Sequence, residues 1–422
     1  MADILKKVLN KIDSQWDEQI SFLQEISRYP STFGNEAPVQ EFIKSKFEKM
    51  KLETDIFDVD LQKINNHPSF SPVNWTYENR PNVVGRLNSG TPKIGKSLIL
   101  QGHIDVVSPE PLKQWNYDPW GAEIDDGRMY GRGVCDMKAG IAAMFYAVQA
   151  IQDCGIQLGA DVVLESVIEE ECTGNGALAT LLNGYDADGG IIPEPTALGT
   201  WDAQVGVIWM QIKVRGLSSH VAESSKSVNA IEKCYVIIEA LQEYHKLVNS
   251  RPKPSAYKDI ENPLNVNVGK IQAGDWPSTV PSECIIECRI GFYPDLDPVD
   301  VKKELEVFLM KAVSKDQWLK NNPPEITFYG FNAHGLFLDR EMEIIKAMER
   351  NHEKILKNKL HYSPSTATTD IRFYNLFFDI PTICYGPLGG NIHAPDEWVD
   401  LESTRSCSKV LSALILDWCG VK

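Results

Sequence analysis

The sequence contains no pair of cysteines in a CxxC arrangement, and its nine cysteines are an odd number spread along the chain. This pattern argues against a disulfide framework and against a zinc ribbon, because both need closely spaced or evenly paired cysteines. We therefore expect reduced thiols, as in the cytoplasm. Cys284 and Cys288 fall on one face of a predicted strand, where packing is their expected role.

Long apolar runs and an excess of basic residues are also missing. No stretch of about 18 apolar residues occurs, which predicts that nothing spans a membrane, and the N-terminal segment lacks the apolar centre of a signal peptide. The chain has 42 Lys and Arg against 58 Asp and Glu, a formal net charge of −16. Nucleic acids and anionic membranes attract clustered basic residues, so neither is an expected partner. A cytoplasmic protein is the expectation.

The first part of the chain predicts an α/β domain. A length of 422 residues is long for one core and comfortable for two domains. Apolar periodicity predicts helices over 3–28, with a break near Ser14, and over 35–51. Strands and helices then alternate, which is typical of a mainly parallel sheet. The expected strands are 54–59, 82–86, 98–101, 161–168 and 189–192, and the expected helices are 137–151 and 177–182. We expect strand 82–86 to pair with strand 98–101.

The pattern changes near residue 200. A strand, a helix, two strands, a helix and a strand follow one another, at 205–214, 228–247, 264–271, 283–290, 299–313 and 325–329. This order predicts an inserted α+β domain with a ferredoxin-like antiparallel sheet. A further helix, a strand and a final helix then complete the first domain. The predicted organisation is therefore a mixed, mainly parallel domain formed by 1–199 and 331–422, with an inserted domain at 200–330.

Acidic and histidine side chains follow several of the predicted parallel strands. They are His103, Asp105, Asp136, Glu170, Glu171 and Glu194. Ligands of open α/β sheets bind beyond the carboxyl ends of the strands, so we expect these side chains to meet at one edge. In this arrangement, the His103 imidazole would face a cation or a substrate. The Asp105 carboxylate would then accept the other ring N–H and select the tautomer.

Each of these residues also has an ordinary structural interpretation. Polar groups at a strand end can simply face water, and Asp136 can cap the helix that follows it. An acidic triplet such as 169–171 is usually a solvated charge run. Here it follows a buried strand, where neighbouring carboxylates repel one another unless a cation or shared protons intervene. Glu194 stands between two prolines and has no nearby helix to cap.

Together these residues predict a metal centre. Zinc in proteins takes histidine nitrogens and carboxylate oxygens, and two ions a few ångströms apart need a bridging carboxylate. The candidate ligands are His103, Asp136, Glu171, Glu194 and His393, with Asp136 shared between the two ions. Two divalent ions are therefore the expected cofactors, zinc first, with cobalt or manganese as alternatives.

Six ordered segments resemble one enzyme family. HIDVV, GRGVCDMKAG, EEECTGNGA, PEPT, RGLSSH and NIHAPDEWV are similar, in order and spacing, to the M20 family of zinc-dependent amidohydrolases and peptidases, and the resemblance covers nearly the whole chain. It implies a metal-binding catalytic domain with an inserted lid that mediates homodimerisation. It also implies hydrolysis of a small N-acylated amino acid, of the acetylornithine deacetylase type. The alternatives are a dipeptidase or exopeptidase, a deformylase or a desuccinylase.

The resemblance further implies residue roles. Glu170 would be the general base, with Asp105 as the orienting neighbour of His103; a register one residue earlier would move these acidic roles to Glu169 and Glu170. His220 would stabilise the oxyanion from the partner subunit. The implied substrate contacts are Arg289, Ser278, Asp370 and Gly389.

Two further alternatives stay open at the sequence level. Arg289 could clamp a substrate carboxylate or form an ordinary ion pair. Ser278 stands where the family commonly has Asn, which leaves its role open. A non-catalytic metal-binding dimer is the competing class of function, and the presence of Glu170 beside Glu171 argues against it, because a binding protein needs no base.

Overall fold

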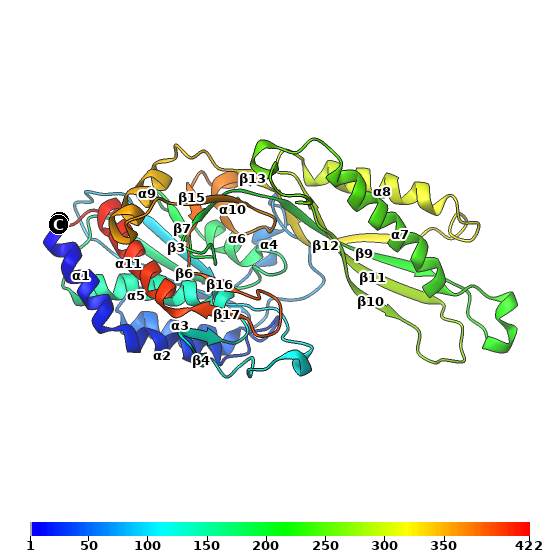
Figure 1. Cartoon of the computed structure of the whole chain (residues 1–422), viewed down its shortest axis with the longest axis horizontal. Helices are drawn as coiled ribbons and strands as arrows, with labels where there is room; N and C mark the ends of the chain where they lie inside the picture. Colours follow the sequence, from blue (N-terminus) through cyan, green and yellow to red (C-terminus); the bar gives the residue numbers. More distant parts are fainter. Residues whose placement is uncertain (1) are drawn as a thin grey trace.

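The larger unit of the structure is built on a six-stranded sheet. The computed structural model describes residues 2–422, and Figure 1 shows this unit on the left. Its strands are β1 (Glu53–Asp58), β2 (Pro81–Leu87), β3 (Leu98–His103), β6 (Val162–Val167), β7 (Gly190–Ile192) and β15 (Thr382–Cys384). They lie in the order β1-β2-β6-β3-β7-β15. The four strands β6, β3, β7 and β15 run parallel, which confirms the mainly parallel α/β class.

One predicted strand pairing is wrong. β2 pairs antiparallel with β6 and with β1, and not with β3. The reason is the crossover connection from β3 through the following helix, which brings β6 back beside β3 and parallel to it. β6 thereby occupies the edge of β3 that β2 would have needed.

Helices cover both faces of this sheet. They are α1 (Ala2–Ser14), α2 (Trp16–Ser27), α3 (Ala37–Lys49), α4 (Leu61–Ile64), α5 (Ala139–Asp153), α6 (Asn175–Leu182), α9 (Glu343–Leu356), α10 (Ile371–Phe377) and α11 (Leu401–Trp418). The N-terminal helix is interrupted at Gln15, as predicted near Ser14. α5 packs against α1 and α11, while α6 packs against α4 and α10. The segment Val134–Asp153 is long and apolar enough to cross a membrane, but it is mostly buried inside the protein, which is typical of a core helix.

Two small sheets complete the larger unit. One contains β4 (Glu123–Asp125), β5 (Arg128–Tyr130), β16 (Gly389–Gly390) and β17 (Trp398–Asp400), and the other contains β8 (Thr200–Gln204), β13 (Leu336–Phe337) and β14 (Tyr362–Ser365). Strands of two to five residues are too short for periodicity to indicate. The pairing of β17 with β5 matters most, because it brings the segment before β17 next to the segment after β5.

The inserted unit has its own sheet and its own core. Its elements are β9 (Gly206–Arg215), α7 (Ala230–Asn249), β10 (Val266–Ala273), β11 (Glu283–Phe292), α8 (Pro298–Val313) and β12 (Glu325–Ala333). The sheet is antiparallel with the order β10-β11-β9-β12, and Figure 1 shows this unit extending away from the larger one. The predicted α+β class is confirmed. The boundaries at 199/200 and 330/331 stay a prediction, and β12 crosses the second of them.

Glu165, in the middle of β6, is a carboxyl group buried in the central sheet. Its residue is 0% exposed, and the Tyr374 hydroxyl donates a hydrogen bond to Oε2 at 2.5 Å. Among the described residues, Oε1 has no hydrogen-bond partner. Burial raises the pKa of Glu165 from 4.5 to about 8, so the group is protonated in the folded protein at neutral pH.

Replacing Glu165 with Gln is therefore expected to stabilise the protein at alkaline pH. A carboxyl whose pKa is raised on folding contributes full stability below its unfolded value, and loses that contribution as the pH rises through the folded value near 8. The loss amounts to at most about 1.4 kcal/mol per pH unit. Urea unfolding at pH 6 and pH 9 measures it. An equal pH dependence in the wild-type and variant proteins would contradict this assignment.

Candidate metal centre and active site

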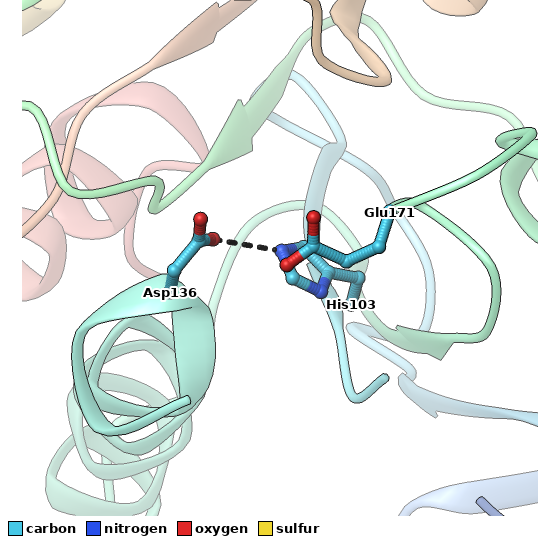
Figure 2. A group of neighbouring side chains, drawn as sticks. All are labelled: His103, Asp136 and Glu171. Carbon is cyan, nitrogen blue, oxygen red and sulfur yellow. Dashed lines mark hydrogen bonds and ion pairs between the residues drawn. The ribbon is translucent and has the colours of Figure 1, made fainter. Parts of the chain in front are cut away.

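The five predicted metal ligands come together at the carboxyl ends of the parallel strands. His103 ends β3, Asp136 lies in the turn before α5, and Glu171 and Glu194 follow β6 and β7, while His393 lies between β16 and β17. Three of these residues follow strands of the central sheet, and the segments that carry Asp136 and His393 meet them at that edge. Figure 2 shows three of the five ligands, with the carboxylates of Asp136 and Glu171 both lying next to the His103 ring.

Asp136 is placed so that its two carboxylate oxygens face different histidines. Oδ1 lies 3.0 Å from Nε2 of His103, and Oδ2 lies 3.7 Å from Nε2 of His393. The same His393 nitrogen is 2.9 Å from a carboxylate oxygen of Glu171. A carboxylate with one oxygen toward each of two ligand groups has the arrangement of a bridging ligand.

The other two carboxylates near His103 approach the same ring nitrogen as Asp136. Oxygens of Glu170 and Glu194 each lie 4.0 Å from Nε2 of His103, and both glutamates are buried. Burial raises the pKa of both carboxyls well above 4.5, and negative charge nearby raises each pKa further, from Glu194 at Glu170 and from Asp136 at Glu194. Two sets of ligand atoms lie within 4.8 Å of one another, namely those of His103, Asp136 and Glu171 and those of His103, Glu170 and Glu194.

This donor set fits divalent cations. Imidazole nitrogens and carboxylate oxygens are the ligands that zinc takes in catalytic sites. Several buried carboxylates in one place need positive charge nearby. A metal centre satisfies both conditions, with Asp136 at its middle.

Asp105 has a different partner from the one predicted. The ring N–H at Nδ1 of His103 donates to the backbone carbonyl of Asp105 at 3.0 Å, whereas the Asp105 carboxylate is 3.7 Å away. That carboxylate accepts the backbone N–H groups of Glu170 and Glu171 at 3.2 and 3.1 Å. This corrects the prediction. The backbone carbonyl of Asp105 orients the ring and leaves Nε2 facing the site. The carboxylate instead pairs with two backbone N–H groups of the loop after β6, which would otherwise lack a partner.

The acidic triplet 169–171 divides into one structural residue and two residues of the site. Glu169 is 0% exposed, and its carboxylate accepts hydrogen bonds from Trp75, Tyr77, Arg80 and Thr173. Glu170 instead has no hydrogen-bond partner at Oε1 among the described residues, and it lines the cavity described next. The geometry therefore favours the register in which Glu170, and not Glu169, faces the reaction.

A cavity of about 450 Å³ opens above the candidate ligands, between the two units. Its aromatic wall consists of Trp201, Trp209 and Phe331, and Trp209 packs edge-to-face on Phe331 with ring centroids 5.2 Å apart. Arg289 of β11 also lines the cavity and donates to the carbonyl of Thr366 at 3.2 Å. Within residues 2–422, no carboxylate lies within ion-pair distance of Arg289. The sequence did not point to the three aromatic residues, because they come from three separate strands.

Besides His103 and Asp105, four predicted site residues do not line this cavity, namely Asp370, Gly389, His220 and Ser278. Asp370 is 0% exposed and accepts a hydrogen bond from Gln101 at 3.0 Å, so a direct substrate contact does not fit its position. Gly389 lies in β16, where a Cβ would come within 2.2 Å of Sγ of Cys135. This glycine therefore serves close packing at that point.

His220 and Ser278 lie together at the far end of the inserted unit. The N–H of Val221 donates to the carbonyl of Ser278 at 3.0 Å, and both His220 and Ser278 are exposed. His220 follows the end of β9, and a strand of ten residues spans about 33 Å. Figure 1 shows this end pointing away from the larger unit. Within one chain, neither residue belongs to the cavity.

Known proteins similar to this chain agree on one family. The sequence pattern of peptidase family M20/M25/M40 matches residues 99–417. N-formyl-4-amino-5-aminomethyl-2-methylpyrimidine deformylase of Halalkalibacterium halodurans is 26% identical over 443 residues, covering 99% of this chain and 98% of that protein. The deformylase of the same name from Bacillus subtilis is 29% identical over 379 residues, covering 85% and 88%.

A solved structure shows the same fold at lower identity. The dipeptidase Dug1p from Saccharomyces cerevisiae superposes with a TM-score of 0.81 at 17% identity, and the match covers 99% of each chain. Together with the family match over most of the sequence, this agrees with a catalytic unit that carries an inserted lid. The chain belongs to peptidase family M20/M25/M40, whose members are metal-dependent hydrolases.

Proposed function

We propose that this protein hydrolyses the amide bond of a small N-acyl amino acid at a two-metal centre, with Glu170 as general base. The observation that carries the proposal is the position of Asp136, whose two oxygens face His103 and His393, with the free Oε1 of Glu170 in the same cavity. Zinc is the proposed ion, and cobalt and manganese are alternatives.

The residues of the site divide the chemical work. Divalent ions held by His103, Asp136, Glu171, Glu194 and His393 would lower the pKa of a bound water and polarise the amide carbonyl. Glu170 accepts a proton from the attacking water and delivers it to the departing nitrogen. Asp105 holds the backbone N–H groups of Glu170 and Glu171, which fixes the base relative to the ligands. Arg289 pairs with the substrate carboxylate, because no carboxylate of the described residues lies within ion-pair distance of its guanidinium.

The inserted unit is proposed to form a homodimer, in which His220 of each chain reaches the cavity of the other. Support comes from the position of His220 at the far end of that unit, remote from the cavity of its own chain. In the cavity, the imidazole would donate a hydrogen bond to the developing oxyanion. Ser278 would accompany it, since the two residues belong to adjoining turns.

A second candidate substrate is an N-formyl amide of an aromatic aminomethyl compound. Trp201, Trp209 and Phe331 give the cavity an aromatic wall suited to a planar ring, and two relatives are deformylases by name. Arg289 distinguishes the two candidate substrates, because an uncharged ring has no carboxylate for the guanidinium to bind.

In Arg289→Gln, kcat/KM for an N-acyl amino acid should fall by about tenfold or more. The kcat/KM for an uncharged formyl amide should fall much less.

A substrate panel with metal removal tests the proposal. N-acetyl, N-formyl and N-succinyl amino acids, dipeptides and a formylated aromatic amine are each assayed with the protein as purified, after chelation, and after addition of Zn²⁺, Co²⁺ or Mn²⁺. We expect hydrolysis of an N-acyl amino acid that is lost on chelation and restored by one of the ions. If no substrate is turned over with any added ion, the proposal is wrong.

A further inference from the structure

Glu397 is a buried carboxylate that contacts the site without facing the cavity. It is 1% exposed and accepts four hydrogen bonds. Oε1 accepts the backbone N–H groups of Cys135 at 3.0 Å and Asp136 at 3.1 Å. Oε2 accepts the N–H of Gly133 at 3.0 Å and Nη1 of Arg132 at 2.6 Å. Four donors use the full accepting capacity of one carboxylate.

The turn that carries Asp136 depends on this carboxylate. Gly133 has a φ of 78°, and a Cβ there would come within 2.2 Å of a Val106 methyl group. Asp136 precedes α5 and has the non-helical dihedrals φ −113° and ψ 97°, so its N–H has no acceptor within that helix. The backbone N–H groups of this turn converge on one point, and without Glu397 they would be buried and unpaired.

Glu397 also belongs to the loop that carries His393. Its own carbonyl accepts the N–H of Gly131 at 3.0 Å, and the next residue, Trp398, pairs with Tyr130. Glu397 therefore links the loop that carries His393 to the turn that carries Asp136, through hydrogen bonds of both its backbone and its side chain. The functional atoms of those two residues lie 3.7 Å apart, so a small shift of either segment changes the gap in which an ion would sit.

We infer that Glu397 is a positioning residue, which sets the affinity of the metal centre by holding Asp136 and His393 at a fixed separation. The inference rests on the proposed metal centre. Glu397 contacts neither an ion nor a substrate in this role, because all four of its accepting positions are taken by the protein.

The test replaces Glu397 with Gln and measures Co²⁺ binding to the metal-free protein. In the variant, the amide NH2 would replace an oxygen that accepts hydrogen bonds in the wild type, so it would face N–H donors with which it cannot pair. We expect the Co²⁺ affinity, measured by competition with a chromophoric chelator, to fall about 10- to 100-fold. We also expect the visible absorption spectrum of the Co²⁺-loaded protein to change, since it reports the arrangement of the ligands.

The matched control is Asp161→Asn. The Asp161 carboxylate likewise accepts a backbone N–H, that of Ser89 at 2.9 Å, and a hydrogen bond from Lys93. It lies just before β6, however, at the opposite end of that strand from Glu170. We expect this variant to have a lower Tm than the wild type but the same Co²⁺ affinity and the same absorption spectrum.

The outcomes separate the inference from the proposed function. Wild-type affinity and spectrum in Glu397→Gln, with only a lowered Tm, would show a merely structural role and overturn the inference. If that variant does not fold, Glu397→Asp replaces it, because the shorter side chain keeps the negative charge but holds it farther from the turn. Wild-type Co²⁺ affinity in Glu397→Asp would overturn the inference equally. A wild-type protein that binds no Co²⁺ would instead refute the metal centre itself.

Discussion

Replacing Glu170 with Gln is expected to lower kcat for amide hydrolysis by about 10²- to 10⁴-fold, the usual contribution of a general base. The substitution preserves the shape of the side chain but removes its ability to accept a proton from water. Metal content should stay at the wild-type level, because Glu170 is not one of the five proposed ligands. Steady-state kinetics together with elemental analysis of the purified variant measure both quantities.

Two further variants sharpen this experiment. Glu171→Gln should lose metal and activity together, since Glu171 is a proposed ligand at 2.9 Å from His393. Mixing Glu170→Gln with His220→Ala should restore part of the activity if His220 acts across the dimer, because one cavity of the mixed dimer then receives both intact residues. Wild-type kcat in Glu170→Gln would refute the assignment of the base, and no recovery on mixing would argue against the role of His220 across the dimer.

The second large effect is expected on stability, from Arg80→Leu. Arg80 is 5% exposed and lies between Glu36 and Glu169, both 0% exposed, with hydrogen bonds to each. Its guanidinium also stacks on Phe33 at 4.3 Å. Removing it leaves two carboxylates buried without their cation, which typically costs about 3–5 kcal/mol. Urea unfolding at constant pH measures the change in the free energy of unfolding.

An exposed arginine provides the control. The side chain of Arg215 is 61% exposed and pairs with Glu325, whose side chain is 56% exposed. Exposed pairs contribute about 0–1 kcal/mol, so Arg215→Leu should remain within about 1 kcal/mol of the wild type. An equally small effect in Arg80→Leu would mean that water or rearrangement compensates the buried carboxylates, and that Arg80 does not anchor Glu169.

Local patterns in the sequence were sufficient to predict the longer helices and strands and the types of ligand. The helix over 137–151 follows from apolar residues on a 3.6-residue period, and α5 occupies Ala139–Asp153. The alternation of strands and helices predicted that side chains following the strands would share one edge of a sheet. His103 and Glu194 lie there for that reason. These features depend on residues close together in the chain, which is why they can be predicted.

Only the tertiary structure decided how those side chains are used. Three features depend on segments far apart in the sequence: the place of β6 between β2 and β3, the hydrogen bonds that the Asp105 carboxylate accepts from the loop after β6, and the aromatic wall of the cavity. Glu397 is the clearest case, since its four donors lie more than 260 residues earlier in the chain. The sequence by itself determined which chemical groups were available and at which strand ends they would lie. Long-range packing determined which carboxylates face the cavity and which hold the backbone, because hydrogen-bond partners are selected only when the elements meet.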